Sequence, residues 1–116
     1  MTRLPPENCR TMAELRLQID AVDRELVALL IERAGYIDRA AEIKPGVGLP
    51  ARIEARVEEV VANVRAAATR GGLEPDLAER LWRQLIEWSI AREEKVLGPD
   101  AERFGRGDRD RLRRGG

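Results

Sequence analysis

The sequence predicts an all-α fold, with one long helix and two shorter helices in each chain. Ala, Leu, Glu and Arg dominate the composition, and these side chains lose little rotamer freedom in a helix. Apolar residues recur at steps of three and four, and no segment shows the alternating pattern of a β-strand. We therefore expect one helical domain over residues 1–97, followed by a disordered, Arg/Gly-rich tail over residues 98–116.

The first helix is expected to run from about Thr11 to Lys44, a length of roughly 50 Å at about 1.5 Å per residue. Thr11 and Glu14 have the spacing of a capping box at its start, and Pro45 stops it. Its apolar stripe consists of Met12, Leu15, Ile19, Val22, Leu26 and Leu29. This spacing places the stripe on one face of the helix.

Turn residues separate the two shorter helices. Residues 45–50 contain two prolines and two glycines, which predicts a loop. The second helix is expected from about Ile53 to Gly71–Gly72, and the third from Pro75 to Leu97. The apolar positions expected to face inward are Val57, Val60, Val61, Val64 and Ala68 on the second helix and Leu77, Leu81, Trp82, Leu85, Ile86, Trp88 and Ile90 on the third.

Composition excludes several classes of function. The 21 basic and 21 acidic residues balance, whereas a nucleic-acid-binding protein usually has a basic excess. Without histidine and with only Cys9, the chain offers no zinc site, no Ser-His or Cys-His catalysis and no internal disulfide. No apolar run approaches the roughly 20 residues that span a bilayer, and the N-terminus lacks the apolar region of a signal peptide. We expect a cytoplasmic protein that binds neither membrane nor nucleic acid.

The long helix also predicts a homodimer. A compact domain of about 100 residues has a radius of gyration near 13 Å, so a helix of roughly 50 Å extends beyond what its own chain can cover. The apolar stripe nevertheless continues along most of that helix. We expect a second copy of the chain to cover the remainder in an interlocked, antiparallel arrangement.

Two cations interrupt the stripe. Arg33 occupies the next apolar step after Leu29, and Lys44 lies eleven residues later, within about 20° of the same face. Such cations either pair with an internal carboxylate, of which Glu93 is the clearest candidate, extend to solvent, or bind an anionic ligand. Arg56 of the second helix is a further candidate for binding the same anion.

Arg16 lies 17 residues before Arg33, about 25 Å along the axis and roughly 100° around it. We expect it to reach the site of the partner subunit rather than the site of its own chain. This set of cationic side chains would suit a small dianionic molecule bound by residues of two subunits.

The segment LRLQIDAVDRELVALLIERAGYIDRAAEIK resembles the first helix of the all-helical (AroQ-class) chorismate mutases, and LWRQLIEWSIAREEK resembles their closing helix. The similarity covers residues from about 7 to 97. It implies an interlocked three-helix homodimer of chorismate mutase II type, which uses neither cofactor nor metal. The implied activity is an isomerase of the shikimate pathway and aromatic amino acid biosynthesis, which rearranges chorismate to prephenate.

The resemblance also implies roles for individual residues. Arg33 and the partner's Arg16 would bind carboxylates of the substrate, and Lys44 would donate to a carboxylate and to the ether oxygen. Arg56, Ser89 and Glu93 would complete the substrate-binding set. Arg33, Lys44 and Glu93 form the expected catalytic set.

Two departures from the family pattern leave alternatives open. Most relatives have Gln at the position of Glu93, so this carboxyl group would have to act protonated. Many mutases have Glu at the position of Val57, and Val here, with the segment PENC, looks more like isochorismate-pyruvate lyases of salicylate and siderophore synthesis. We favour the mutase over the lyase. A third hypothesis is a non-catalytic helical dimer that partners a larger shikimate-pathway enzyme.

Overall fold

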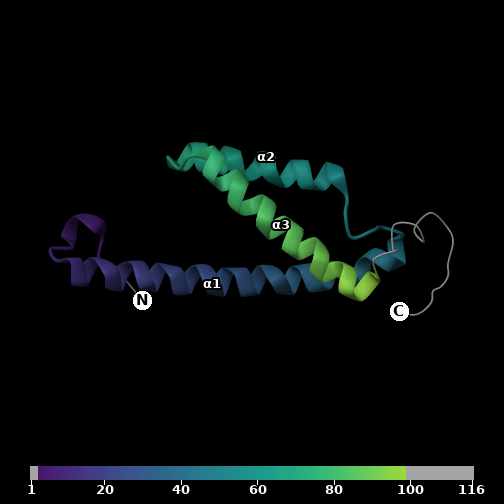
Figure 1. Cartoon of the computed structure of the whole chain (residues 1–116), viewed down its shortest axis with the longest axis horizontal. Helices are drawn as coiled ribbons and strands as arrows, with labels where there is room; N and C mark the ends of the chain where they lie inside the picture. Colours follow the sequence, from purple (N-terminus) through teal and green to yellow (C-terminus); the bar gives the residue numbers. More distant parts are fainter. Residues whose placement is uncertain (1–2, 99–116) are drawn as a thin grey trace. The chain divides into compact units, whose positions relative to one another are not determined.

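The computed structural model describes residues 3–98, and all regular structure in this range is helical. The elements are the 3-10 helix η1 (Pro6–Asn8), α1 (Met12–Ile43), the 3-10 helix η2 (Lys44–Val47), α2 (Glu54–Gly71) and α3 (Pro75–Leu97) (Figure 1). One long and two shorter helices confirm the predicted all-α class for the described residues. The predicted tail lies outside that range, except for Gly98.

The start and end of α1 follow from the residues that flank it. Thr11 Oγ1 accepts a hydrogen bond from the Glu14 N–H at 3.1 Å, and Glu14 Oε1 accepts one from the Thr11 N–H at 3.3 Å. These two bonds confirm the capping box. The helix ends at Ile43, and the loop predicted over residues 45–50 begins as a 3-10 turn because Pro45 cannot continue the α-helical hydrogen bonding.

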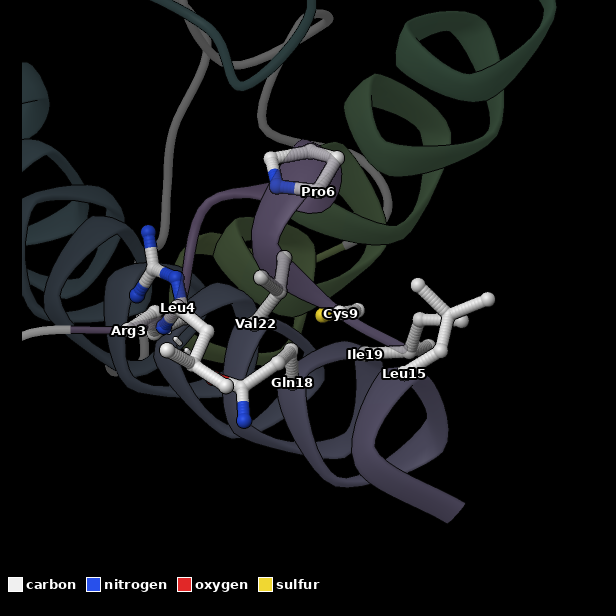
Figure 2. Close-up of a pocket in the computed structure, with 8 residues that line it drawn as sticks. All are labelled: Arg3, Leu4, Pro6, Cys9, Leu15, Gln18, Ile19 and Val22. Atoms are coloured by element: carbon white, nitrogen blue, oxygen red, sulfur yellow. Dashed lines mark hydrogen bonds between the residues drawn. The ribbon is translucent and has the colours of Figure 1, made fainter. Parts of the chain in front are cut away.

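The chain divides into two compact units, with the boundary after Tyr36. In the first unit, the N-terminal arm folds back onto α1: the Leu4 N–H donates to Gln18 Oε1 at 3.1 Å, and Arg3 forms an ion pair with Glu25. Arm and helix enclose a pocket of about 330 Å³ with an apolar lining (Figure 2). Its apolar side chains are Leu4, Pro6, Leu15, Ile19 and Val22.

The predicted apolar stripe of α1 lies largely uncovered within a single chain. Met12 is 57% exposed, Leu26 is 53% exposed and Leu29 is 60% exposed. The only buried residue of α1 is Ala41, close to its C-terminal end. The stripe is therefore an apolar face that the described residues cover only near the N-terminal arm.

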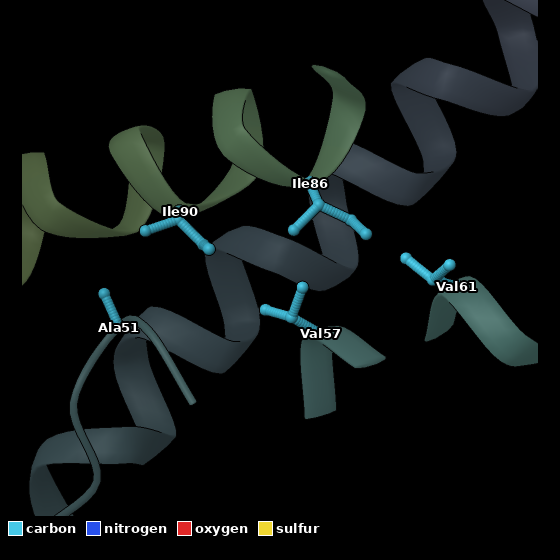
Figure 3. Packing of buried hydrophobic residues seen from close by; sticks show 5 residues of the cluster. All are labelled: Ala51, Val57, Val61, Ile86 and Ile90. Carbon is cyan, nitrogen blue, oxygen red and sulfur yellow. The ribbon is translucent and has the colours of Figure 1, made fainter. Parts of the chain in front are cut away.

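In the second unit, α2 and α3 pack against each other on either side of a short turn (Figure 1). Their contact forms the core, a cluster of buried side chains shown in Figure 3: Ala51, Val57, Val61, Ile86 and Ile90. Val57 and Val61 come from α2 and Ile86 and Ile90 from α3, and the sequence predicted all four as inward-facing. Leu81 and Trp88 were expected to be inward-facing too, but each is about half exposed in the single chain.

No helix within residues 3–98 combines the length and the apolar character needed to cross a membrane.

The turn between α2 and α3 depends on Gly72. Its φ of +85° lies in the left-handed region, and the Leu73 N–H donates to the Ala68 carbonyl at 2.8 Å, which closes the helix end. Residues other than glycine rarely adopt this backbone conformation, because their Cβ atom comes too close to the backbone.

We predict that alanine changes the free energy of unfolding differently at the two adjacent glycines, Gly71 and Gly72. Gly72→Ala should lower the free energy of unfolding by about 1 kcal/mol because of its positive φ. Gly71→Ala should leave it unchanged or raise it by up to about 1 kcal/mol, since Gly71 is helical and has open space at its Cβ position. Urea unfolding of both variants measures this difference. Equal effects would show that the turn does not depend on the left-handed residue.

Candidate active site

A nearly buried ion pair joins Lys44, the first residue of η2, to Glu93 of α3. Lys44 Nζ lies 2.6 Å from Glu93 Oε1, and the two side chains are only 15% and 5% exposed. The same ammonium donates to the backbone carbonyl of Ala51 at 2.8 Å. An ammonium group has three N–H donors, so these contacts leave the third to a ligand as far as residues 3–98 are concerned.

The local fold explains how these groups meet. Pro45 ends α1, so that Lys44 lies at the junction with η2. The chain then turns at Gly48, whose φ is +71°, and returns so that the buried residue Ala51 presents its carbonyl to Lys44. Glu93 comes from the buried face of α3, which also carries Ile86 and Ile90. The pair was one of the alternatives that sequence reasoning left open for Lys44.

Ser89 lies one turn before Glu93 and is also buried, with 4% of its surface exposed. Its hydroxyl donates to the Leu85 carbonyl at 2.9 Å, a bond within the same helix. Ser89 and Glu93 are the two buried polar residues of α3. A buried hydroxyl and a buried carboxyl one turn apart form a polar strip on an otherwise apolar face.

The other predicted cations differ in unit and exposure. Arg16 and Arg33 belong to the first unit, where Arg16 is exposed near the start of α1 and Arg33 is half-buried. Arg56 is exposed on α2 and pairs with Glu59 at 2.9 Å. The described contacts therefore bring together Lys44 and Glu93, with Ser89 one turn away, and do not bring Arg56 to them.

Val57 directly follows Arg56 but points the other way, into the core between α2 and α3. At this position the chain contributes an apolar side chain to packing rather than a polar group to the site. The spacing of the valines explains this, because Val57 and Val61 are one turn apart on the buried face of α2.

A second contact between α1 and α3 was missed by sequence reasoning. Arg92 Nε lies 2.6 Å from Asp38 Oδ1, Arg92 Nη2 lies 3.0 Å from Asp38 Oδ2, and the guanidinium stacks over Trp88 at 5.2 Å. The hydrogen bond from Arg92 lowers the pKa of the Asp38 carboxyl below its ordinary value. The residues are 54 positions apart, and nothing in their local sequence pairs them.

Within the part of the chain that the structure describes, no group of His, Cys, Asp or Glu residues could hold a metal ion. The polar groups of the site's own residues are an ammonium, a hydroxyl and a carboxyl group. Lys44 can donate to an anion or to an oxygen that gains negative charge, and Glu93 can donate only when it is protonated.

Residues 15–94 match the family model described as chorismate mutase type II. The chain is 33% identical over 94 residues to the isochorismate pyruvate lyase of Pseudomonas aeruginosa, an alignment that covers 78% of this chain and 88% of the lyase. It is 26% identical over 86 residues to the chorismate mutase of Methanocaldococcus jannaschii, covering 74% of this chain and 87% of that enzyme.

A longer relative matches over part of its length. The T-protein of Enterobacter agglomerans is 33% identical over 93 residues, which cover 77% of this chain and 25% of the T-protein. The chain thus spans about a quarter of that relative.

Proposed function

The chain belongs to the chorismate mutase type II family, and on this premise we propose that it rearranges chorismate to prephenate. The observation that carries the proposal is the Lys44–Glu93 pair, in which an ammonium and a carboxyl group meet at a nearly buried position. We place the reaction at the branch of the shikimate pathway that leads to aromatic amino acids, in the cytoplasm.

The proposed reaction suits the residues of the site. In this Claisen rearrangement the ether C–O bond breaks and a new C–C bond forms within one molecule, so neither a nucleophile nor a proton transfer is required. The enzyme has to hold the two carboxylates so that the side chain folds over the ring. It also has to stabilise the negative charge that grows on the ether oxygen as its bond breaks.

Carboxylate binding is assigned to arginines. We propose that Arg33 binds one substrate carboxylate together with Arg16 of the partner subunit, because a guanidinium fork suits bidentate binding. Arg56 would contribute after leaving Glu59, which requires little energy because exposed ion pairs stabilise a protein weakly. Ser89 would bind through its hydroxyl by turning away from the Leu85 carbonyl.

Charge stabilisation is assigned to Lys44 and Glu93. We propose that Lys44 donates its third N–H towards the ether oxygen and a carboxylate, while Ala51 keeps the ammonium in place. Glu93 would approach the same oxygen as a protonated acid, since a carboxylate there would repel the developing charge.

This role for Glu93 predicts a pH dependence. Turnover should fall as pH rises, because ionisation of Glu93 replaces a donor with a repelling charge. Glu93→Gln, whose amide donates at every pH, should flatten the profile of kcat against pH. Glu87→Gln is the matched control, since Glu87 lies on α3 but pairs with Arg52 on the surface, and it should keep the wild-type profile. An unchanged profile in Glu93→Gln removes Glu93 from the mechanism.

Isochorismate is the alternative substrate, and a lyase that releases pyruvate from it is the second candidate function. Two observations favour this alternative. Val57 is packed in the core, where many mutases have an acidic residue. The Pseudomonas aeruginosa relative, which matches over most of its length, is named an isochorismate pyruvate lyase. The family description and the Methanocaldococcus jannaschii relative favour the mutase.

Product analysis with both substrates tests the proposal. We expect the purified chain to convert chorismate to prephenate with a kcat/KM at least about tenfold above its value for isochorismate, a difference of about 1.4 kcal/mol in transition-state binding. Salicylate and pyruvate from isochorismate at the higher kcat/KM would establish the lyase instead. If neither substrate is consumed, the third hypothesis of a non-catalytic partner replaces both enzymes.

The proposed site requires a homodimer. The exposed stripe of α1, with Met12, Leu26 and Leu29 each more than half exposed, is an apolar face that a second copy of the chain would cover. The half-exposed Leu81 and Trp88 give α3 a further apolar face for the same contact. We propose that this interlocked dimer brings Arg16 of the partner subunit to Lys44.

Mixing inactive variants tests the contribution of Arg16 across subunits. Arg16→Gln and Lys44→Met should each be inactive, but heterodimers of the two contain one intact site. Random reassociation should restore about a quarter of wild-type activity, since half of the dimers are mixed and one of two sites is intact. Arg33→Gln mixed with Lys44→Met should restore none, because both residues would serve the same site from the same chain. Equal recovery in both mixtures, or none in either, would contradict the arrangement.

A further inference from the structure

Asp38, Arg92 and Trp88 form a contact within the unit that contains Lys44 and Glu93. Two nitrogens of the guanidinium group are paired: Arg92 Nε lies 2.6 Å from Asp38 Oδ1, and Arg92 Nη2 lies 3.0 Å from Asp38 Oδ2. The Trp88 ring lies 5.2 Å from the guanidinium carbon. Asp38 thus binds one edge of the Arg92 guanidinium group, and Trp88 contacts one of its faces.

This contact joins α1 to α3 close to the Lys44–Glu93 pair, in which η2 meets α3. Asp38 lies on α1 six residues before Lys44, and Arg92 directly precedes Glu93 on α3. The side chains of Asp38 and Arg92 are 47% and 41% exposed, whereas Lys44 and Glu93 are nearly buried. The two ion pairs are thus an outer and an inner connection between the end of α1 and α3.

We propose that Asp38, Arg92 and Trp88 are positioning residues, an outer clamp that fixes Lys44 opposite Glu93 for the rearrangement. The kinetic part of this inference rests on the proposed function. The clamp acts through Lys44 and Glu93, and its own residues need not touch the substrate.

The physical reason is that two separate contacts of α3, with α1 and with the start of η2, restrict their relative motion more than one contact does. The α2–α3 core holds α3 against α2, and the Lys44–Glu93 pair connects α3 to the chain after α1 at one point only. A guanidinium bound through both nitrogens to both oxygens of Asp38 has a defined plane, and stacking on Trp88 restricts the rotamers of Arg92. The outer clamp therefore adds a second fixed point between α1 and α3, which keeps Lys44 opposite the Glu93 carboxyl group.

Loosening the clamp should affect turnover more than substrate binding. Asp38→Asn and Arg92→Lys both keep the approximate side-chain size but lose the paired hydrogen bonds. We expect kcat to fall about tenfold and KM to change less than about threefold, because a displacement of about 1 Å in a reacting group can reduce the rate about 100-fold. The charge-exchanged double variant Asp38→Arg with Arg92→Asp should recover part of the lost kcat.

Arg83 provides a matched control on the same helix. It is 43% exposed, and it binds Glu58 of α2 and Glu79 rather than any residue of α1. Arg83→Gln should therefore lower stability to a similar extent and leave kcat within about twofold of wild type. Equal losses of kcat in Arg83→Gln and Asp38→Asn, or no loss in Asp38→Asn, would overturn the proposal.

A measurement that does not use activity separates the clamp from the proposed function. The chain contains two lysines, the nearly buried Lys44 and the exposed Lys95. Acylation by N-hydroxysuccinimidyl acetate, followed by peptide mass spectrometry, gives the rate at Lys44 relative to Lys95. Asp38→Asn should raise this ratio at least about threefold, because Lys44 leaves Glu93 more often, and Arg83→Gln should not.

Turnover and the acylation ratio test the proposed function and the clamp independently. If the wild type converts neither chorismate nor isochorismate, the proposed function is wrong, and the acylation ratio alone decides whether the clamp positions Lys44. An unchanged ratio in Asp38→Asn overturns the clamp even if the wild type is an active mutase.

Discussion

The buried contact between Lys44 and Glu93 is the interaction on which the described site depends. Burying either charge alone costs several kcal/mol, so each group requires the other, and the Ala51 carbonyl completes the set of partners. The rest of the second unit positions these groups. Pro45 ends α1 just before Lys44, and the following loop brings the Ala51 carbonyl back to it. The α2–α3 core holds the face of α3 that carries Glu93. A site assembled in this way has a buried ammonium group with one N–H donor that no described residue accepts, beside a buried carboxyl group.

The other constraint is the apolar face of α1. Most of its large apolar side chains remain exposed within one chain, and this is the region that carries Arg16 and Arg33. Under the proposed dimer, the same burial that stabilises the assembly would bring the two arginines to the sites. Stability and substrate binding would then share one cause, and a monomeric chain would lose both. The outer clamp of Asp38, Arg92 and Trp88 would act on a finer scale, within one subunit.

Sequence patterns predicted the fold closely because its signals are local. The three-and-four spacing, the Thr11–Glu14 capping box, Pro45, Gly72 and Pro75 each act within a few residues, and the observed helices begin and end at those points. The partnership of Lys44 with Glu93 was one of several alternatives, since periodicity gives a face but not the element opposite. Two contacts could not be predicted: a backbone carbonyl such as that of Ala51 has no residue type to mark it, and the Asp38–Arg92 pair joins positions 54 apart. Leu81 and Trp88 show the same limit, because periodicity does not distinguish a face covered by the same chain from one left exposed.

The central claim is that cations of two subunits surround one dianionic molecule beside the Lys44–Glu93 pair. A crystal structure of the dimer with bound prephenate tests it most directly. The account predicts that Arg33 and Lys44 of one subunit, with Arg16 of the partner subunit, contact the two carboxylates of the ligand. Arg33 and Lys44 extending into bulk solvent, or Arg16 of the partner subunit lying far from the ligand, would contradict it.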